Sequence, residues 1–505
     1  MKAMTYEADI IIVGGGTAGL VLAGRLSENP DLQVLVLEAG QDQGQDPYVH
    51  QLSEPQVALN GKQIPIPQGR LLGGTSAMNG LAWIANSKSN VDAWGALGNP
   101  GWDWETVNPY YQKTYTLTLP SDEKCEELSL GYVDPQIHAA NGPLKVVIER
   151  DGQNAKLFLE RLLPSCKGSA KSAPHYRGAS SQGCTATSGE LAATGVQYAL
   201  NGELVTAKAR QEVIVAAGVS NSPQLLELSG IGSSEILNKF DIPVLVENSN
   251  VGENLQDHPL AGVSFEAQDF LNTKDDMMRG VPEVIGAAMA EYQNKQFGAF
   301  TVGGNYSSAL LPLADFADSE TGARELASVL SSMASSSSDG FDNELTNILH
   351  PLSRGSSHIT SAKAEDPPVI DPRYLSHPAD LEMLARHTRF VDSIAASEPF
   401  ASMLKPGGKR SPGAPADLWA VSLDEVKEYV QAAGKSTFHP TGTCAMMRRE
   451  KGGVVDARLR VWGTRSLRVV DASVIPIIPT GNTQSAVHAI AERAADLIKE
   501  DLFKA

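Results

Sequence analysis

The chain has 505 residues, of which 42% are hydrophobic and 20% charged, so it is expected to be globular. Its length suffices for the hydrophobic cores of about two or three domains. Its 41 basic and 59 acidic residues give a formal net charge of −18. This charge disfavours nucleic acids and anionic membranes as partners, because both bind basic surfaces. The four cysteines form no CxxC pair, so we expect neither a metal site nor a disulfide framework.

The N-terminal segment carries the most informative pattern of the chain. An apolar run ends in a Gly-x-Gly-x-x-Gly turn made by Gly14, Gly16 and Gly19, and a helix of small residues follows. A second apolar run, residues 34–37, ends at Glu38, at about the spacing of the acid that binds a ribose hydroxyl. This order predicts a dinucleotide site, and the acid favours NAD or FAD over NADP.

The following segments alternate between patterned and poorly patterned sequence. Residues 60–85 are rich in glycine, and the aromatic residues between 94 and 111 are predicted to lie in the core. Residues 114–185 lack a clear period. A buried strand is predicted over residues 212–218, and the helix after it is expected to carry Pro223 in its first turn.

The remainder of the chain falls into two parts. Residues 260–430 mix helices with short strands and include a predicted loop at the serine run 335–338. The last 75 residues return to a strand, at 468–471, and a helix, at 483–497. The chain therefore opens and closes on a cofactor domain, with an inserted segment that caps the site. No apolar stretch reaches the ~18 residues that span a bilayer.

Five blocks, taken in order, resemble those of the glucose–methanol–choline (GMC) flavin oxidoreductases. The blocks are residues 14–19 with 38–40, 73–76 with 79–80, 222–226 with 229–232, 251–259, and 439–443 with 470–473 and 481–482. The resemblance implies an α/β, Rossmann-like FAD-binding domain, formed by residues 1–110, 186–260 and 431–505. It also implies an α+β substrate-binding domain, formed by residues 111–185 and 261–430.

The resemblance also assigns the cofactor site, which is expected to hold FAD. The residues implied to contact FAD are Gly14, Gly16, Thr17, Ala18, Gly19, Glu38, Ala39, Arg70, Gly74, Thr75, Asn79, Gly80, Leu81, Ala82, Ala217, Asp471, Ala472, Asn482 and Thr483. Some members bind FAD covalently through a histidine where this chain has Met78, so we expect non-covalent FAD. Residues 151–190 are shorter than the family pattern, which affects the expected contact with the adenine.

Oxidation of an alcohol by a flavin needs a base for the hydroxyl proton and a path for the hydride to flavin N5. The resemblance makes His439 the base, because an imidazole exchanges protons near neutral pH. Asn482 is implied to bind the substrate oxygen, and its place before the last helix also suits an N-cap. His258, His488 and Arg354 are interpreted as structural residues.

The predicted function is oxidation of a small or secondary-metabolite alcohol to a carbonyl compound, with oxygen or another electron acceptor. A non-redox lyase or cyclase of the same fold, with His439 as acid or base, is the alternative, and a flavin-binding protein without catalysis is the third. The sequence does not identify the substrate or the oligomeric state. No signal peptide is evident, so a cytoplasmic protein is expected, although a processed secreted form stays open.

Overall fold

The computed structural model describes residues 5–40, 48–49, 52–80, 82–119, 121–127, 141–147, 176–180, 184–187, 190–200, 202–271, 273, 275–295, 298–301 and 349–503. Leu81, the serine run 335–338 and most of residues 151–190 lie outside these ranges, as do the predictions made for them. The described helices are α1 (Thr17–Leu26), α2 (Lys88–Ala96), α3 (Trp104–Thr114), α4 (Asp122–Glu127), α6 (Gly218–Leu228), α7 (Ser234–Lys239), α8 (Asp275–Met278), α9 (Pro282–Lys295), α11 (Pro378–Ala395), α12 (Phe400–Met403), α13 (Leu423–Ala433) and α14 (Thr483–Phe503).

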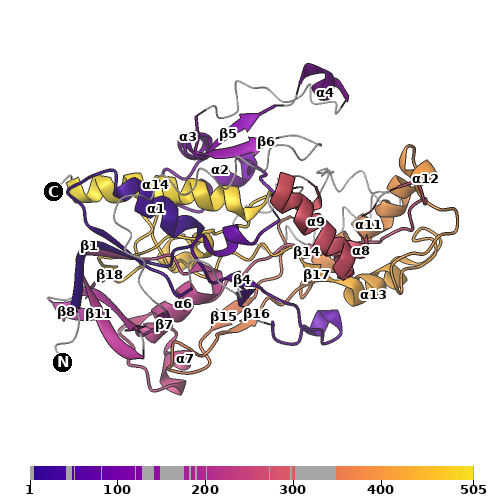
Figure 1. Ribbon diagram of the computed structural model, residues 1–505. Helices are drawn as coiled ribbons and strands as arrows, with labels where there is room; N and C mark the ends of the chain where they lie inside the picture. Colours follow the sequence, from indigo (N-terminus) through magenta and orange to yellow (C-terminus); the bar gives the residue numbers. More distant parts are fainter. Residues whose placement is uncertain are drawn as a thin grey trace.

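A six-stranded sheet forms the centre of the fold (Figure 1). Its strands are β1 (Thr5–Val13), β2 (Val34–Leu37), β7 (Tyr176–Ser180), β10 (Gly195–Leu200), β11 (Glu203–Val215) and β19 (Leu467–Val469). The order is β2-β1-β11-β10-β7, and the second half of β11 also pairs with β19. Strands β2, β1, β11 and β19 are mutually parallel, whereas β10 is antiparallel to both β11 and β7.

The remaining strands are short and form small sheets around the centre. They are β3 (Tyr48–Val49) with β4 (Gln68–Gly69), β5 (Tyr115–Thr118) with β6 (Leu144–Val147), β12 (Ile231–Gly232) with β13 (Val246–Glu247), β14 (Pro259–Leu260) with β17 (Lys435–Ser436), β15 (Ser356–His358) with β16 (Val369–Asp371), and β9 (Glu190–Ala193) between β8 (Cys184–Thr187) and β18 (Thr464–Arg465).

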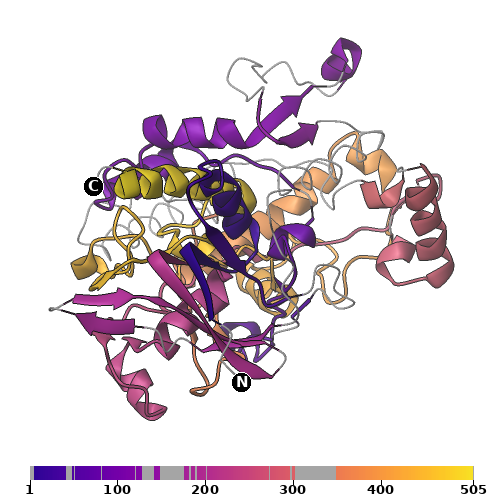
Figure 2. The same ribbon diagram turned by 60° about the vertical axis from the view of Figure 1, so that its left-hand side comes forward.

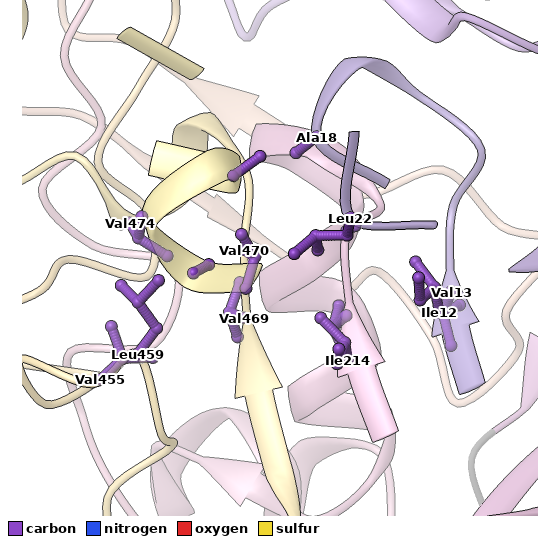
Figure 3. Close-up of a cluster of buried hydrophobic side chains, with 14 of the residues drawn as sticks. Ile12, Val13, Ala18, Leu22, Ile214, Val455, Leu459, Val469, Val470 and Val474 are labelled. Atoms are coloured by element: carbon purple, nitrogen blue, oxygen red, sulfur yellow. The ribbon is translucent and has the colours of Figure 1, made fainter. Parts of the chain in front are cut away.

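The core lies between the parallel strands and the helices that cover them. The apolar run Ile10, Ile11 and Ile12 of β1 is fully buried, as expected of a parallel strand covered on both faces. Figure 3 shows Ile12 of β1, Leu22 of α1 and residues of β11 and β19 in one cluster. Helices α1 and α14 lie side by side over this part of the sheet (Figures 1 and 2), so the N- and C-terminal segments share one core.

The C-terminal end of α14 is fastened to the sheet by charged side chains. Arg468 of β19 is 2% exposed and donates to Glu212 at 2.7 Å and to Asp501 at 2.7 Å. Arg458 and Arg460 also donate to Asp501. Burial acts to raise the pKa of Asp501, but the hydrogen bonds from the three arginines outweigh it and lower the pKa to about 2. The carboxylate therefore stays ionised and holds the helix end.

A second hydrophobic cluster joins α11 and α13, away from the large sheet. Leu384 and Ala385 of α11 pack with Val426 and Val430 of α13. Figures 1 and 2 show these helices together with α8, α9 and α12 on the side opposite β1 and β11. Residues 260–430 thus contain the mixture of helices and short strands that the sequence predicts.

Several local predictions are confirmed and one is wrong. The strand at 34–37 is present, and Trp94, Trp102 and Tyr111 are buried in the core. Helix α6, however, begins at Gly218, so Pro223 is its sixth residue and lies inside the helix. A proline there cannot donate to the carbonyl of Val219. The hydroxyl of Thr443 donates to that carbonyl instead, at 2.6 Å, and so compensates for the missing bond.

A search of the described residues finds no helix with the length and apolar character that a membrane crossing requires.

Replacement of Thr443 tests this compensation. Thr443→Val keeps the shape but leaves the buried carbonyl of Val219 without a donor, and we expect it to lower the free energy of unfolding by about 1 to 3 kcal/mol. Thr441→Val is the matched control, because the Thr441 hydroxyl is also buried but has no partner among the described residues. Urea denaturation of both variants should show a loss in the first only, and equal losses would contradict the assignment.

Candidate active site

The glycine turn between β1 and α1 has no room for side chains. Gly14 has φ +114°, and a Cβ atom there would lie 2.2 Å from the carbonyl oxygen of Ala216. A Cβ on Gly19 would lie 1.9 Å from the carbonyl oxygen of Gly14. These two positions let the turn close and let α1 pack tightly on β1, as the sequence predicts.

The N-terminus of α1 is open to a ligand. Gly16 is the N-cap residue, and no side chain caps the helix. A Cβ on Gly16 would meet only the Cα of Gly74, at 3.9 Å. The second glycine block lies against this turn, since the N–H of Gly73 donates to the carbonyl of Gly15 at 2.9 Å. Uncapped N–H groups beside an open glycine suit the pyrophosphate of a dinucleotide, so these residues fit FAD.

Glu38 closes the other side of the glycine turn. Its carboxylate accepts hydrogen bonds from the N–H groups of Gly15 and Gly40, both at 2.7 Å. Burial raises the pKa of Glu38, and the backbone hydrogen bonds act in the opposite direction. The acid therefore stands next to the glycine turn, where the ribose contact is expected from the sequence.

The ends of β11 and β19 meet at the same edge. Asp471, after β19, accepts from the N–H of Gly218 at 2.9 Å and from the hydroxyl of Ser222 at 2.6 Å. The N–H of Ala217 donates to the same Ser222 hydroxyl at 3.1 Å. The carbonyl of Ala472 accepts from the N–H of Gly442 at 3.2 Å. The strand ends are thereby connected to the loop that carries His439.

The glycine-rich segment 69–80 contacts the last helix. The side-chain amide of Asn79 donates to that of Gln484 at 2.5 Å. The segment is partly open to solvent: Arg70, Thr75 and Gly80 are exposed. The other predicted contact residues show the same range of exposure. Thr17, Ala82, Ala472 and Thr483 are half-buried, Ala18 is buried and Ala39 is exposed.

The side chains of His439 and Asn482 are in direct contact. The Nδ2 atom of Asn482 lies 2.8 Å from Nε2 of His439, although the two residues are 43 positions apart. His439 follows β17, and Asn482 directly precedes α14. Burial lowers the pKa of His439 to about 4, so its imidazole is neutral at pH 7.

His258 contacts the same imidazole from the opposite side. Its Nδ1 lies 2.9 Å from Nδ1 of His439, and the two rings meet edge to face at 87°. The Nε2 atom of His258 lies 2.9 Å from the carbonyl oxygen of Leu349. Burial, and secondarily the proximity of His439, lowers the pKa of His258 to about 3. From the sequence, His258 is interpreted as a structural residue, and the structure places it in direct contact with the candidate base.

A buried carboxylate holds the loop of His439. Asp257 is 4% exposed and accepts from the N–H of His439 at 2.9 Å. The hydroxyls of Ser436, at 2.5 Å, and Tyr374 also donate to it. Burial raises the pKa of Asp257, against the effect of these donors. With several donors and no basic side chain in contact among the described residues, Asp257 acts as an anchor for the backbone.

The segment that contains Asp257 and His258 also connects the loops that carry His439 and Asn482. Gln256 pairs with the backbone of Thr441 in both directions, at 3.0 and 2.8 Å. Its side chain donates to the carbonyl of Pro476 at 3.0 Å and accepts from the N–H of Ile478 at 3.3 Å. One segment therefore sets the distance between the loop of His439 and the loop that leads to Asn482.

The other residues that the sequence singled out lie outside this contact. The guanidinium of Arg354 donates to Asn254 at 3.0 Å and to backbone carbonyls. His488 is buried in α14 against Trp83, with ring centroids 5.4 Å apart. Cys444 is a buried free thiol. The contact between His258 and His439 was missed, although both residues stand in the quoted family blocks, because no sequence spacing relates residues 181 positions apart.

Comparison with known families decides the identity. Family models described as GMC oxidoreductase match residues 8–169 and 184–260, and residues 351–491. The chain belongs to the GMC oxidoreductase family. Residues 170–183 are unmatched and fall inside the stretch 151–190, which is expected from the sequence to be shorter than the family pattern, whereas residues 151–169 and 184–190 are matched.

Curated relatives and solved structures agree with this membership. Dehydrogenase mpl7 of Monascus purpureus is 31% identical over 615 aligned residues, covering 98% of this chain and 96% of that protein. An FAD-dependent oxidoreductase from Chaetomium thermophilum superposes with a TM-score of 0.81 at 25% identity, covering 98% and 99% of the two chains. A fungal aryl-alcohol oxidase shares the fold, with a TM-score of 0.79 at 22% identity and the same coverage.

Membership gives this GMC protein its cofactor and general chemistry. It is an FAD-dependent oxidoreductase that acts on a small-molecule substrate and passes electrons to an acceptor. The alignment with the Monascus relative is longer than this chain, so the relative has segments without a counterpart here.

Glu38 offers a test of the cofactor site that does not depend on turnover. Glu38→Gln replaces one acceptor oxygen by an amide that cannot accept from a backbone N–H, and we expect FAD to bind about tenfold more weakly. Titration of deflavinated protein with FAD, followed by flavin fluorescence, measures the change. Glu7→Gln, at an exposed position of β1, serves as the control. An unchanged dissociation constant for Glu38→Gln would contradict this role.

Proposed function

We propose that this enzyme oxidises the CH–OH group of a small or secondary-metabolite alcohol to a carbonyl, with His439 as the base and Asn482 as the residue that orients the hydroxyl. The observation that carries the proposal is the contact of 2.8 Å between Nε2 of His439 and Nδ2 of Asn482. A hydroxyl group placed between a neutral imidazole and an amide donor can donate a hydrogen bond to the first and accept one from the second.

The chemistry of the pair follows from its donors and acceptors. A substrate hydroxyl replaces the direct contact: its hydrogen is donated to Nε2 of His439, and its oxygen accepts from Nδ2 of Asn482. The proton then passes to Nε2, and Asn482 cannot compete for it because an amide is not basic at this pH. Bound FAD supplies the two-electron acceptor for the hydride of the carbinol carbon.

The surroundings of the pair support this division of labour. The pKa of His439, at about 4, leaves the base free of protons across the neutral range. Asp257 anchors the backbone of His439, and Gln256 spaces the two loops. The aryl-alcohol oxidase and a pyridoxine 4-oxidase among the structural neighbours also favour an alcohol as substrate. Oxygen or another acceptor completes the cycle.

The proposal includes the cofactor residues and the domains. We assign FAD to the glycine turn, to Glu38, to the segment 69–82 and to the ends of β11 and β19, as the resemblance implies. We assign residues 1–110, 186–260 and 431–505 to the FAD-binding domain, and residues 111–185 and 261–430 to the substrate-binding domain.

The deciding experiment is anaerobic titration of the yellow holoenzyme with a panel of primary alcohols, followed by flavin absorbance. Bleaching by one class of alcohol identifies the substrate class, and admission of air then distinguishes an oxidase from a dehydrogenase. A flavin that no alcohol bleaches would contradict the proposal and point to the non-redox lyase or cyclase chemistry of the same fold.

Variants of the two residues should separate their roles. His439→Ala should slow flavin reduction by about 10²- to 10⁴-fold, because the proton has no acceptor. Asn482→Ala should slow it roughly tenfold to a hundredfold through the loss of one hydrogen bond to the oxygen. In the wild type, the base is free above its pKa, so the reduction rate should hold from pH 7 downward and fall only as the pH approaches 4. Stopped-flow absorbance measures each rate, and equal rates in wild type and His439→Ala would exclude this base.

The attachment of FAD has its own test. A methionine thioether does not form the bond that a histidine at position 78 would form, so FAD is expected to be released when the protein is unfolded. Acid precipitation should leave the yellow colour in the supernatant. Met78→Leu should behave in the same way, and flavin that stays with the precipitated protein would show that a covalent link exists.

A further inference from the structure

His258 and His439 form a hydrogen bond whose direction is fixed by a third group. The carbonyl oxygen of Leu349 can only accept, and it lies 2.9 Å from Nε2 of His258. Nε2 of His258 therefore carries the hydrogen. His258 is neutral, because its burial strongly disfavours the charged form. Its Nδ1 is then a bare acceptor.

This acceptor decides where the hydrogen of His439 lies. Two bare nitrogen atoms do not stay 2.9 Å apart, so Nδ1 of His439 carries the hydrogen that the pair shares. The hydroxyl of Thr437 agrees with this placement. It donates to the carbonyl of His258 at 3.1 Å, which leaves its oxygen lone pairs free to face Nδ1 of His439 at 3.2 Å.

We propose that His258 is a positioning residue, which holds His439 in the tautomer with the hydrogen on Nδ1 and the lone pair on Nε2. This inference rests on the proposed function and deepens it. The opposite tautomer carries its hydrogen on Nε2. It would present an N–H group to the substrate hydroxyl and could not accept the hydroxyl proton there. The bond from Asn482 Nδ2 to His439 Nε2 has the direction that the proposed tautomer requires.

The same arrangement suits the protonated base. When Nε2 of His439 accepts the substrate proton, Nδ1 keeps its hydrogen bond to His258, so no bond has to be exchanged. The titratable and charged groups near the pair come from three segments of the described chain. Asp257 accepts from the His439 backbone and Tyr374 donates to Asp257, while His350 interacts electrostatically with His258, and Arg354 with His350. Of these, Asp257 contacts His439 directly, through the backbone N–H.

Two substitutions of His258 separate the acceptor from the bulk of the ring. His258→Leu removes every acceptor, so His439 samples both tautomers, and we expect kcat/KM for the reactive alcohol to fall about tenfold. His258→Asn keeps an oxygen near the position of Nδ1 and should recover most of that loss. Flavin absorbance and melting temperature establish that each variant is a folded holoenzyme. Equal losses in both variants would overturn the proposal.

A spectroscopic measurement tests the tautomer without turnover. The holoenzyme is labelled with ¹⁵N-histidine, and the signals of His439 are assigned by comparison with His439→Gln. Nitrogen shifts of the protonated type for Nδ1 and of the bare type for Nε2 are expected in the wild type and in His258→Asn, and averaged shifts in His258→Leu. His488→Leu is the matched control, since it replaces another buried histidine, and should leave the His439 signals unchanged.

The outcomes distinguish the two proposals. A hydrogen on Nε2 of His439 in the wild type would overturn the inference even if alcohols bleach the flavin, and it would do so even if the His258 variants failed to fold. A hydrogen on Nδ1 in a holoenzyme that no alcohol reduces would support the role of His258 and contradict the proposed function.

Discussion

The parallel pairing of β11 with β1 on one side and β19 on the other is the constraint on which the rest of the structure depends. Parallel strands end at a common edge, so the glycine turn after β1, Ala217 after β11 and Asp471 after β19 meet there although they come from distant parts of the chain. The hydrogen bond from Gly218 to Asp471 joins two of these ends. The loop that carries His439 reaches the same edge through the hydrogen bond from the N–H of Gly442 to the carbonyl of Ala472.

Burial shifts the pKa values of the groups around His439 in opposite directions, because it disfavours the charged form of each group. It keeps His439 and His258 neutral, as the proposed roles of a base and a hydrogen-bond acceptor require. It also raises the pKa of Asp257, whose donors must offset the cost of a buried carboxylate. The surroundings of His439 thus combine two neutral imidazole rings with one hydrogen-bonded carboxyl group, Asp257. The chemistry proposed for them depends on the direction of the hydrogen bonds as much as on charge.

Sequence reasoning recovers the features that local patterns determine. The apolar run of β1, the turn at Gly14 and the strand ending at Glu38 are visible because backbone conformation and burial constrain the residue types there. The resemblance to a family supplied His439 and Asn482. The role of Thr443 at the carbonyl of Val219 and the contact of His258 with His439 were not predictable, since both depend on tertiary contacts between residues with no relation in spacing.

Helix α14 has 21 residues and is therefore about 32 Å long. It begins beside Asn482 and ends where Asp501 binds the arginines around β19. The helix therefore connects the surroundings of Asn482 to the charged cluster at β19. For protein engineering, a truncation before Asp501 removes the carboxylate that the three arginines share, and Leu502 after it also packs against the core. A fusion partner attached after the helix leaves these contacts in place, whereas a chain that ends earlier loses them.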